Sequence, residues 1–493
     1  MIFSRRSFLA AATTLRAFSA SAQNVAGPQP YGPLPSTPQL LWSEMEIYNF
    51  LHFTINTFTD KEWGYGDESP TLFNPTAFDA DAIVSTLKES GSKGVILTCK
   101  HHDGFCLWPT KTTERSVKNS PFRNGRGDVV KEVSEAAQRQ GLKFGVYVSP
   151  WDRSQASYGL PEYIQIYRQQ IRELLTGYGP VFEIWHDGAN GGDGFYGGAR
   201  ERRIIDKLHY YDWDNTWKME RDLRPGAVRF SDVGPDIRWV GNEKGIAGDP
   251  CWATYTPVGA DGGPASPGNV KESEATSGTR NGKFWMPAEC DVSIRPGWFW
   301  HEAENARVKT SRELLTLFYD STGRGASFLL NVPPDRRGLI DEPDSASLRG
   351  FGKLLREIFS RNLAKQAGSI VASNIRGNDM AYGPHMLLDD SLDTYWSTDD
   401  RVTTAVIVFD FPSSVTFNLV RMRENIRLGQ RIGGFAVDTW IDSAWRQVAV
   451  GTSVGSCRIV RLSNTVRTAR VRLRITECPV CPAVPEFGLF LES

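Results

Sequence analysis

Apolar positions between about residues 51 and 190 alternate between a helical and an extended period. In FDADAIVSTLKESG, Ile83 and Leu87 lie four residues apart on one helical face, and Asp79 stands where it can cap the helix. The apolar run GVILTC follows and predicts a buried strand. The unit repeats as DVVKEVSEAAQRQG before LKFGVYVSPWD, and as YIQIYRQQIRELLTGYG before PVFEIWHDG. Strands that alternate with helices of this length predict a parallel sheet.

Polar residues stand at the ends of these strands. The strand ends carry HHD, SPWD and WHDG, and the earlier run IYNFLHFTIN carries His52. A (β/α)8-like barrel delivers the carboxyl ends of its strands to one face, where such enzymes build their sites. We therefore expect a barrel over residues 30–362. Its later strands are weaker, with RPGAVRFSD, DIRWVGNEKG and GASFLLNVPPD as candidates, and the Gly/Ser/Pro-rich segment 256–282 predicts an irregular surface loop.

The pattern changes after FGKLLREIFSRNLAKQ. Short alternating runs such as TAVIVFDF, FNLVRMR and ARVRLRIT replace the helices, which indicates an all-β region. We expect a β-sandwich of jelly-roll type over residues 365–493. The fold class is thus multidomain α/β plus all-β, in keeping with a length of 493 residues.

Composition narrows the range of partners. The formal net charge is -1 with 23% charged residues, which argues against nucleic acid or another polyanion. Fifteen tryptophans favour carbohydrate, because indoles pack against the apolar faces of sugars. Seven cysteines are too few to form a disulfide framework, so CPVC at 478–481 is either a local disulfide or two free thiols.

The first residues have the pattern of an export signal. MIFSRRSFLAAATTLRAFSASAQ combines a basic start, a short apolar stretch and small residues before a cleavage site, so residues 1–22 predict a twin-arginine-like signal. No later segment approaches the roughly 18 apolar residues of a membrane span. We expect a periplasmic or secreted protein.

Asp187 stands where an apolar strand breaks into the glycine-rich loop GANGGDGFYGG. A carboxylate at such a strand end serves as a nucleophile or base, whereas the structural alternative is an aspartate that caps a turn.

Four stretches taken in order, HFTINTFTDKEWGYGD, KHHDGFCLWPTKTT, VYVSPWD and EIWHDGANGG, resemble glycoside hydrolase family 29, the α-L-fucosidases. The resemblance implies a retaining, exo-acting hydrolase that removes terminal fucose from a fucosylated oligosaccharide or glycoconjugate. It places the nucleophile at Asp187. It also implies that the following residues bind the sugar: His52, Glu62, Trp63, His101, His102, Tyr147 and Trp185.

Two glutamates compete for the role of general acid/base. Glu243 lies in GPDIRWVGNEKG, which resembles the subfamily that prefers branched α1,3- and α1,4-linked fucose, and this favours Glu243. Glu289, in MPAECDVSIRPGWFWH, is the alternative. If Glu243 is the acid, we expect Glu289 either at the rim or in support of the site; at the rim it would help Trp298 and the residues up to His301 to hold a branching galactose.

The implied mechanism needs no cofactor. A rival interpretation takes His52, His101 and His102 as metal ligands. It is disfavoured because adjacent residues on an extended chain point to opposite sides and no HExxH-like spacing accompanies them.

The segment ASNIRGNDMAYGPHMLLDDSLDTYWSTDD resembles the start of discoidin or coagulation factor 5/8 C domains. Such domains often hold a structural calcium ion through carboxylate and carbonyl oxygens, so Asp389, Asp390 and Asp393 are the candidate ligands. Whether this domain binds sugar or only braces the barrel is left open.

Two alternatives to a fucosidase stay open at this point: a non-hydrolytic fucose-binding protein on a decayed barrel, and a glycosidase of a related sugar such as galactose. The presence of both candidate glutamates argues against decay. The sequence does not predict the oligomeric state.

Overall fold

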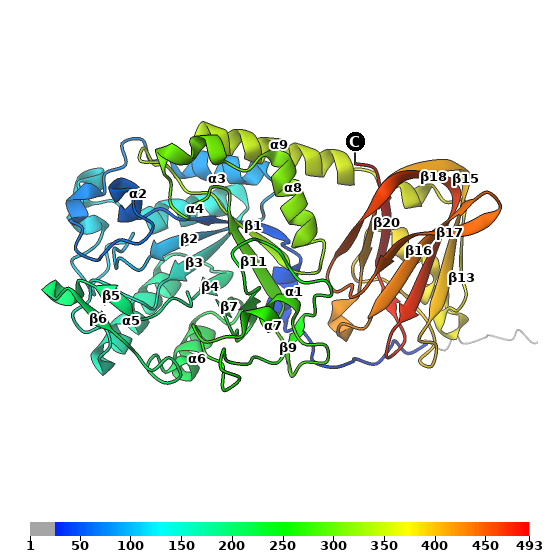
Figure 1. Cartoon of the computed structure of the whole chain (residues 1–493), viewed down its shortest axis with the longest axis horizontal. Coiled ribbons are helices and arrows are strands. Elements are labelled where there is room, and N and C mark those ends of the chain that lie inside the picture. Colours follow the sequence, from blue (N-terminus) through cyan, green and yellow to red (C-terminus); the bar gives the residue numbers. More distant parts are fainter. Residues whose placement is uncertain (1–24, 493) are drawn as a thin grey trace, which may run out of the picture.

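The computed structural model describes residues 25–492. Figure 1 shows a barrel with its helices at one end and an antiparallel β domain at the other, joined by the long helix α9. The predicted export signal, residues 1–22, lies outside the described residues. Among the helices described, none is long and apolar enough to cross a bilayer.

Eight parallel strands close the barrel in the order β1-β12-β11-β8-β7-β4-β3-β2. The predicted barrel is therefore confirmed. The strands are β1 (Ile47–Leu51), β2 (Gly94–Lys100), β3 (Lys143–Val148), β4 (Glu183–Trp185), β7 (Val228–Ser231), β8 (Ile237–Trp239), β11 (Ala288–Ser293) and β12 (Ser327–Asn331).

Helices cover the outside of the barrel, and their sequences explain where they begin and which face they bury. In α3, Asp79 accepts a hydrogen bond from the Ala82 amide, while Ile83 and Leu87 are fully buried, as their spacing predicted. The helices are α1 (Thr37–Ser43), α2 (Ile55–Thr59), α3 (Ala80–Glu89), α4 (Val129–Gln140), α5 (Pro161–Gly177), α6 (Trp213–Leu223), α7 (Glu272–Ser277), α8 (Ser311–Asp320) and α9 (Glu342–Phe359).

The barrel is irregular between β7 and β11. Only residues 232–236 join β7 to β8, too few for a helix, and the segment after β8 contains α7 and the two-stranded sheet β9 (Thr254–Tyr255) and β10 (Phe284–Trp285). The segment 256–282 is thus only partly the irregular loop that its composition predicts. A second two-stranded sheet, β5 (Gly192–Gly194) and β6 (Glu201–Arg203), extends the loop after β4.

The C-terminal domain is an antiparallel sheet that bends over its own core. The long strands β15 and β18 lose register between Asp410 and Val415 and again between Phe417 and Leu419, and the buried side chains of both halves face one cluster. This agrees with the expected sandwich. The strands are β13 (Ser369–Ala372), β14 (Trp396–Ser397), β15 (Ala405–Arg423), β16 (Gly434–Ile441), β17 (Ala444–Gly451), β18 (Arg458–Glu477), β19 (Ala483–Val484) and β20 (Glu486–Phe490).

The segment before α1 runs away from the barrel and lies along the C-terminal domain (Figure 1). The Tyr31 amide donates to the Leu428 carbonyl at 2.9 Å. The Arg376 guanidinium donates to the Ala26 carbonyl at 2.6 Å, and Arg431 donates to the Gln29 carbonyl. Residues far apart in the sequence are thereby joined.

Candidate active site

A pocket of about 190 Å³ opens at the carboxyl ends of the barrel strands. It brings together most of the residues that the sequence predicted. Its lining consists of Phe50, His52, Trp63, His101, His102, Tyr147, Trp185, Asp187, Gly188, Ala189, Phe230, Asp232, Trp239, Glu243, Asp291 and Trp298.

Asp187 follows β4 and is held by two hydrogen bonds. The Tyr147 hydroxyl donates to Oδ2 at 2.7 Å, and the Ala189 amide donates to Oδ1 at 2.7 Å. Burial raises the pKa of Asp187, while these two donors lower it in part. The side chain is 22% exposed, so a ligand in the pocket can reach it. Oδ1 therefore caps the turn that follows the strand, while Oδ2 is held by Tyr147 at the pocket, so the turn-capping contact and a nucleophile role are compatible.

His52 and His102 present acceptor nitrogens toward the pocket. Nδ1 of His52 lies 2.8 Å from Asn331 Oδ1, and Nδ1 of His102 lies 2.7 Å from Ser149 Oγ, whose hydroxyl is donated to the Trp151 carbonyl. Each Nδ1 therefore carries the proton, which leaves Nε2 as an acceptor for a sugar hydroxyl. Burial lowers the pKa of both imidazoles to about 3, so both are neutral at physiological pH.

The two adjacent histidines share one side of the chain. Their ring centroids are 4.1 Å apart and both rings line the pocket. The expectation that they point to opposite sides was wrong, because β2 ends at Lys100 and the chain turns, with the Gly104 amide bonded to the His101 carbonyl at 3.0 Å. Gly104 has a φ of +78°, which glycine adopts without strain.

This turn creates the geometry that the metal interpretation requires. One ligand atom each from His101, His102 and Asp187 lies within 4.8 Å of the others. Neutral imidazoles and a carboxylate are suitable zinc ligands, so the group could serve a cation as well as a sugar. His52 is outside this group.

Glu62 and Trp63 belong to the loop after α2, but they play different parts. The Trp63 ring lines the pocket, is 53% exposed and lies edge-on to His102 at 5.3 Å. Glu62 is not among the lining residues. Its carboxylate accepts hydrogen bonds from the Trp298 amide at 2.8 Å and from the Phe299 amide at 3.2 Å. It therefore supports the loop that carries Trp298.

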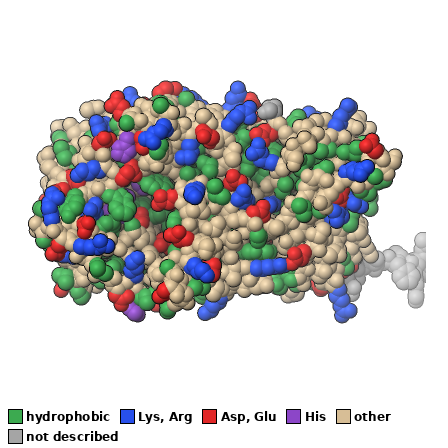
Figure 2. Space-filling view, viewed as in Figure 1, with side chains coloured by type: hydrophobic (Ala, Val, Ile, Leu, Met, Phe, Trp, Pro, Cys, Tyr) green, Lys and Arg blue, Asp and Glu red, His purple; other side chains and the backbone are tan. Residues whose placement is uncertain are grey.

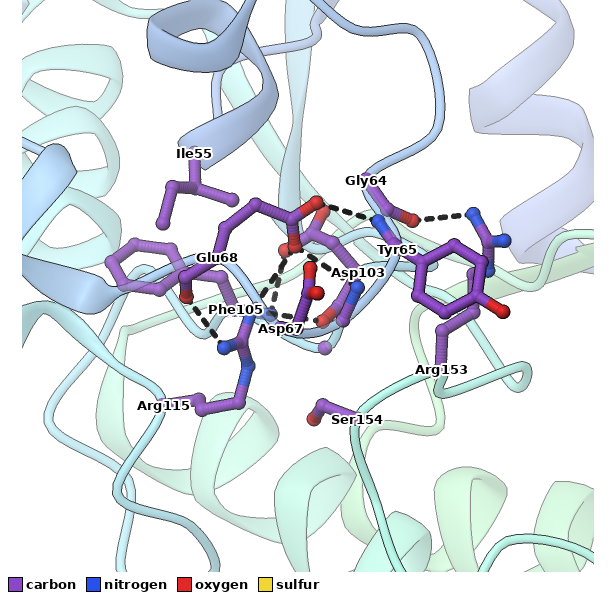
Figure 3. Close-up of polar contacts among 12 residues, drawn as sticks. Ile55, Gly64, Tyr65, Asp67, Glu68, Asp103, Phe105, Arg115, Arg153 and Ser154 are labelled. Carbon is purple, nitrogen blue, oxygen red and sulfur yellow. Dashed lines mark hydrogen bonds and ion pairs between the residues drawn. The ribbon is translucent and has the colours of Figure 1, made fainter. Parts of the chain in front are cut away.

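A buried ionic cluster anchors the loop that carries Trp63 (Figure 3). Glu68 accepts from the Tyr65 and Gly66 amides at 2.6 and 2.9 Å and pairs with Arg115 at 3.5 Å. Burial, the largest single influence, acts to raise the pKa of Glu68, but the amide donors and the Lys61 ammonium together outweigh it and the pKa is lowered. Asp103, which lies beside Glu68, has its pKa raised to about 7 by burial and by the Glu68 charge.

Glu243 follows β8 and stands at the mouth of the pocket. The Trp298 indole donates to its Oε2 at 3.4 Å. Partial burial raises the pKa of Glu243, and the charges of Asp187 and Glu62 add to the increase, while the hydrogen bond from Trp298 acts against it. A raised pKa favours the protonated form, which is the form that a general acid needs.

Glu289 is not at the rim. Its side chain is fully buried in the barrel interior, and it accepts hydrogen bonds from the Trp185 indole at 2.6 Å and from the Tyr48 hydroxyl. Of the two positions expected for Glu289, the one at the rim beside Trp298 was wrong, because Glu289 lies near the start of β11, below the pocket floor, and not in a loop.

Two carboxyl groups in the pocket were missed. Asp232 directly follows the run GAVRFS, so the strand-end pattern that identified Asp187 could have found it. It accepts from the Gly268 amide at 2.9 Å, and burial raises its pKa to about 7. Asp291 lies in β11, a strand that the apolar pattern did not reveal.

The three aspartates proposed as calcium ligands face different partners. Asp390 pairs with Lys365, and Asp393 lies 3.3 Å from Arg427. Asp389 accepts from the Thr394 hydroxyl at 2.5 Å. The structure does not gather them into one ligand set, and the calcium site stays a prediction. Cys478 and Cys481 are buried free thiols, which selects one of the two alternatives left by the sequence.

A closed (β/α)8-like barrel whose strand ends bring histidines, tryptophans and several carboxyl groups into one pocket is typical of a glycoside hydrolase of the barrel class. Sequence comparison specifies the family. The family described as "Alpha-L-fucosidase" matches residues 34–358. "Alpha-L-fucosidase 1" of Arabidopsis thaliana is 43% identical over 94% of this chain and 89% of its own length.

Solved structures agree. A glycoside hydrolase 29 family member from an unidentified rumen bacterium is 40% identical with a TM-score of 0.82, over 94% of this chain and 78% of that chain. A Ruminococcus gnavus GH29 fucosidase in complex with fucose is 31% identical with a TM-score of 0.85, over 95% and 97% of the two chains. The chain belongs to the α-L-fucosidase family and is an α-L-fucosidase, a glycoside hydrolase.

Proposed function

We propose that the chain is a retaining exo-α-L-fucosidase with Asp187 as the nucleophile and Glu243 as the acid/base. The observation that carries this proposal is that both groups line one pocket in different surroundings. Burial raises the pKa of both, but Asp187 accepts two hydrogen bonds of 2.7 Å that favour its ionised form, whereas Glu243 accepts the Trp298 indole at 3.4 Å and its pKa is raised further by the charge of Asp187.

The two steps use these groups in turn. Asp187 attacks the anomeric carbon of fucose and forms a glycosyl ester while the glycosidic oxygen leaves with the proton of Glu243. Glu243 then removes a proton from water, and the hydroxide attacks the same carbon and releases Asp187. Two inversions give net retention.

The pocket supports exo-action on a neutral sugar. At about 190 Å³ it is smaller than the roughly 300 Å³ at which sites for drug-sized ligands begin, so it suits one terminal ring. His52 and His102 offer acceptors for hydroxyl groups, and Phe50 and Phe230 offer apolar surface for a methyl group. The face in Figure 2 intersperses basic and acidic side chains, as expected for a neutral glycan substrate.

The mechanism is tested by replacing Asp187. Asp187→Gly is expected to stay folded and to lose several orders of magnitude of turnover on an aryl α-L-fucoside, with azide restoring the reaction and yielding β-fucosyl azide. An Asp187→Asn protein that is folded and turns over at a near-normal rate would end the assignment. Such a result would show that a residue other than Asp187 is the nucleophile.

Linkage preference is a second part of the proposal. The GPDIRWVGNE segment supports a preference for branched α1,3- or α1,4-linked fucose, and the exposed Trp63 and the Trp298 loop flank the pocket where a second sugar would lie. We expect Lewis a or Lewis x trisaccharide to be cleaved much faster than a linear 2'-fucosylated glycan, because remote binding can lower the barrier. Equal rates would remove the subfamily assignment and leave the fucosidase intact.

Export completes the proposal. The twin-arginine-like residues 1–22 support a periplasmic or secreted enzyme. Detection of the chain in the cytoplasm alone, with an uncleaved N-terminus, would contradict it.

A further inference from the structure

Strand β11 carries two buried carboxyl groups, Asp291 in the pocket lining and Glu289 below it, and the proposed mechanism gives Glu289 no role. Glu289 and Asp291 are two positions apart, so both face the barrel interior, and they are 0% and 3% exposed. Each accepts a hydrogen bond from a tryptophan of the pocket wall. Trp185 Nε1 lies 2.6 Å from Glu289, and Trp239 Nε1 lies 2.7 Å from Asp291.

We propose that Glu289 is a positioning residue: from below the pocket floor it fixes the Trp185 indole, and through it the nucleophile. The inference rests on the proposed function, because it assumes that Asp187 is the nucleophile. Asp291, which holds Trp239 in the same way, shows that the arrangement is repeated along the strand.

The connection from Glu289 to the reaction consists of direct contacts. The Trp185 ring stacks on Phe230 with centroids 4.2 Å apart, and on Tyr147 at 5.1 Å with an interplanar angle of 23°. The Tyr147 hydroxyl donates to Asp187 at 2.7 Å. A tilt of the indole would therefore move the ring that carries this donor.

The chemistry of the site explains why a carboxylate stands at position 289. Its two oxygens serve two donors, the Trp185 indole and the Tyr48 hydroxyl. Glu183 of β4 is buried near it. Burial and then the charge of Glu289 raise the pKa of Glu183 well above its usual range, and burial raises the pKa of Glu289 to about 7. The two buried carboxyl groups therefore do not both ionise, and Glu183 is the more readily protonated of the two.

This assignment supplies a matched control. Glutamine at position 183 reproduces a protonated carboxyl, since its amide can donate to Glu289 while its oxygen accepts the Trp42 indole, which now lies 3.0 Å away. Glutamine at position 289 offers one acceptor oxygen to two donors. Both changes remove one carboxyl from the same buried pair, but only Glu289→Gln takes away an acceptor oxygen that a donor now uses, either the Trp185 indole or the Tyr48 hydroxyl.

The experiment compares kcat/KM on an aryl α-L-fucoside for Glu289→Gln and Glu183→Gln at a temperature where circular dichroism shows both folded. We expect Glu289→Gln to lose roughly tenfold, the equivalent of one hydrogen bond of about 1.4 kcal/mol, with the acid limb of its pH profile moved upward. Glu183→Gln should stay within about twofold with an unchanged profile.

Equal kcat/KM values and equal pH profiles in the two variants would overturn the inference, whatever their melting temperatures. If Glu289→Gln does not fold, Glu289→Asp keeps the charge and withdraws the oxygen from the indole by one methylene, and it should show the same loss. Normal kcat/KM in Glu289→Asp would likewise overturn it. The unmodified enzyme and Asp187→Asn run alongside, so failure of the nucleophile assignment is recognised separately.

Discussion

Removal of the Tyr147 hydroxyl should change the pKa of Asp187 by an amount that can be measured. Tyr147→Phe keeps the ring that stacks on Trp185 and removes only the donor to Asp187 Oδ2. A hydrogen bond to a charged group contributes about 1.5–3 kcal/mol, which corresponds to roughly one to two pKa units. Because Asp187 is 22% exposed and water can replace part of the lost bond, we expect the lower end, about one unit.

The sign follows from the structure. The Tyr147 hydroxyl lowers the pKa of Asp187, so its loss raises that pKa. Only the ionised carboxylate attacks, and therefore the acid limb of kcat/KM should move upward by about one pH unit. Activity near the optimum should fall less than activity on the acid side.

The assay is a pH profile of kcat/KM on an aryl α-L-fucoside for the unmodified enzyme, Tyr147→Phe and a control. Tyr211→Phe is a matched control, since this buried hydroxyl bonds to the Tyr158 hydroxyl at 2.8 Å and the residue does not line the pocket. An acid limb that stays in place in a folded Tyr147→Phe protein would refute the assignment of Asp187 as the group whose ionisation limits the reaction. A shift of equal size in Tyr211→Phe would show that the change is not local.

Further predictions concern metal ions and the anchored loop. Chelator should leave kcat/KM of the full chain unchanged, because the two-carboxylate mechanism uses no Lewis acid. A loss of activity that zinc restores would instead favour a metal site formed by His101, His102 and Asp187. If the C-terminal domain holds calcium, the same chelator treatment should lower the melting temperature, and added calcium should restore it; a melting temperature insensitive to both would remove the predicted ion. Glu68→Gln should lower the free energy of unfolding by about 1–3 kcal/mol and raise KM, because it weakens the contacts that anchor the Trp63 loop. The control Asp67→Asn disturbs a pair with the largely exposed Arg200 and should lower that free energy by at most about 1 kcal/mol. Equal effects of the two variants would contradict the anchoring role of Glu68.

The sequence predicted correctly those parts of the fold in which the apolar positions of the sequence are the positions that the structure buries. Strands such as GVILTC are apolar along their length because helices cover them, and the residues just beyond them marked the pocket correctly. The strand β11 was not predicted, because its inward positions carry Glu289 and Asp291 in place of apolar residues. Buried carboxyl groups that pair with indoles do not produce the apolar pattern by which a buried strand is recognised in a sequence.

The remaining differences arise from contacts between distant residues. The shared orientation of His101 and His102 depends on a turn that only the three-dimensional chain reveals, and the role of Glu62 depends on amides at positions 298 and 299. Local sequence identified which residues are present at the site. It did not show which of them line the pocket and which hold their neighbours.

The attachment of residues 25–31 to the C-terminal domain has a consequence for the order in which the chain can be completed. These residues leave the ribosome early, but the groups that hold them, Arg376, Leu428 and Arg431, are synthesised several hundred residues later. The segment 25–31 can therefore make these contacts only after the last domain has been synthesised. If residues 1–22 are the twin-arginine-like signal that the sequence predicts, a route that moves folded proteins would meet, next to the signal, a segment that is attached in finished chains and unattached in chains interrupted before that domain.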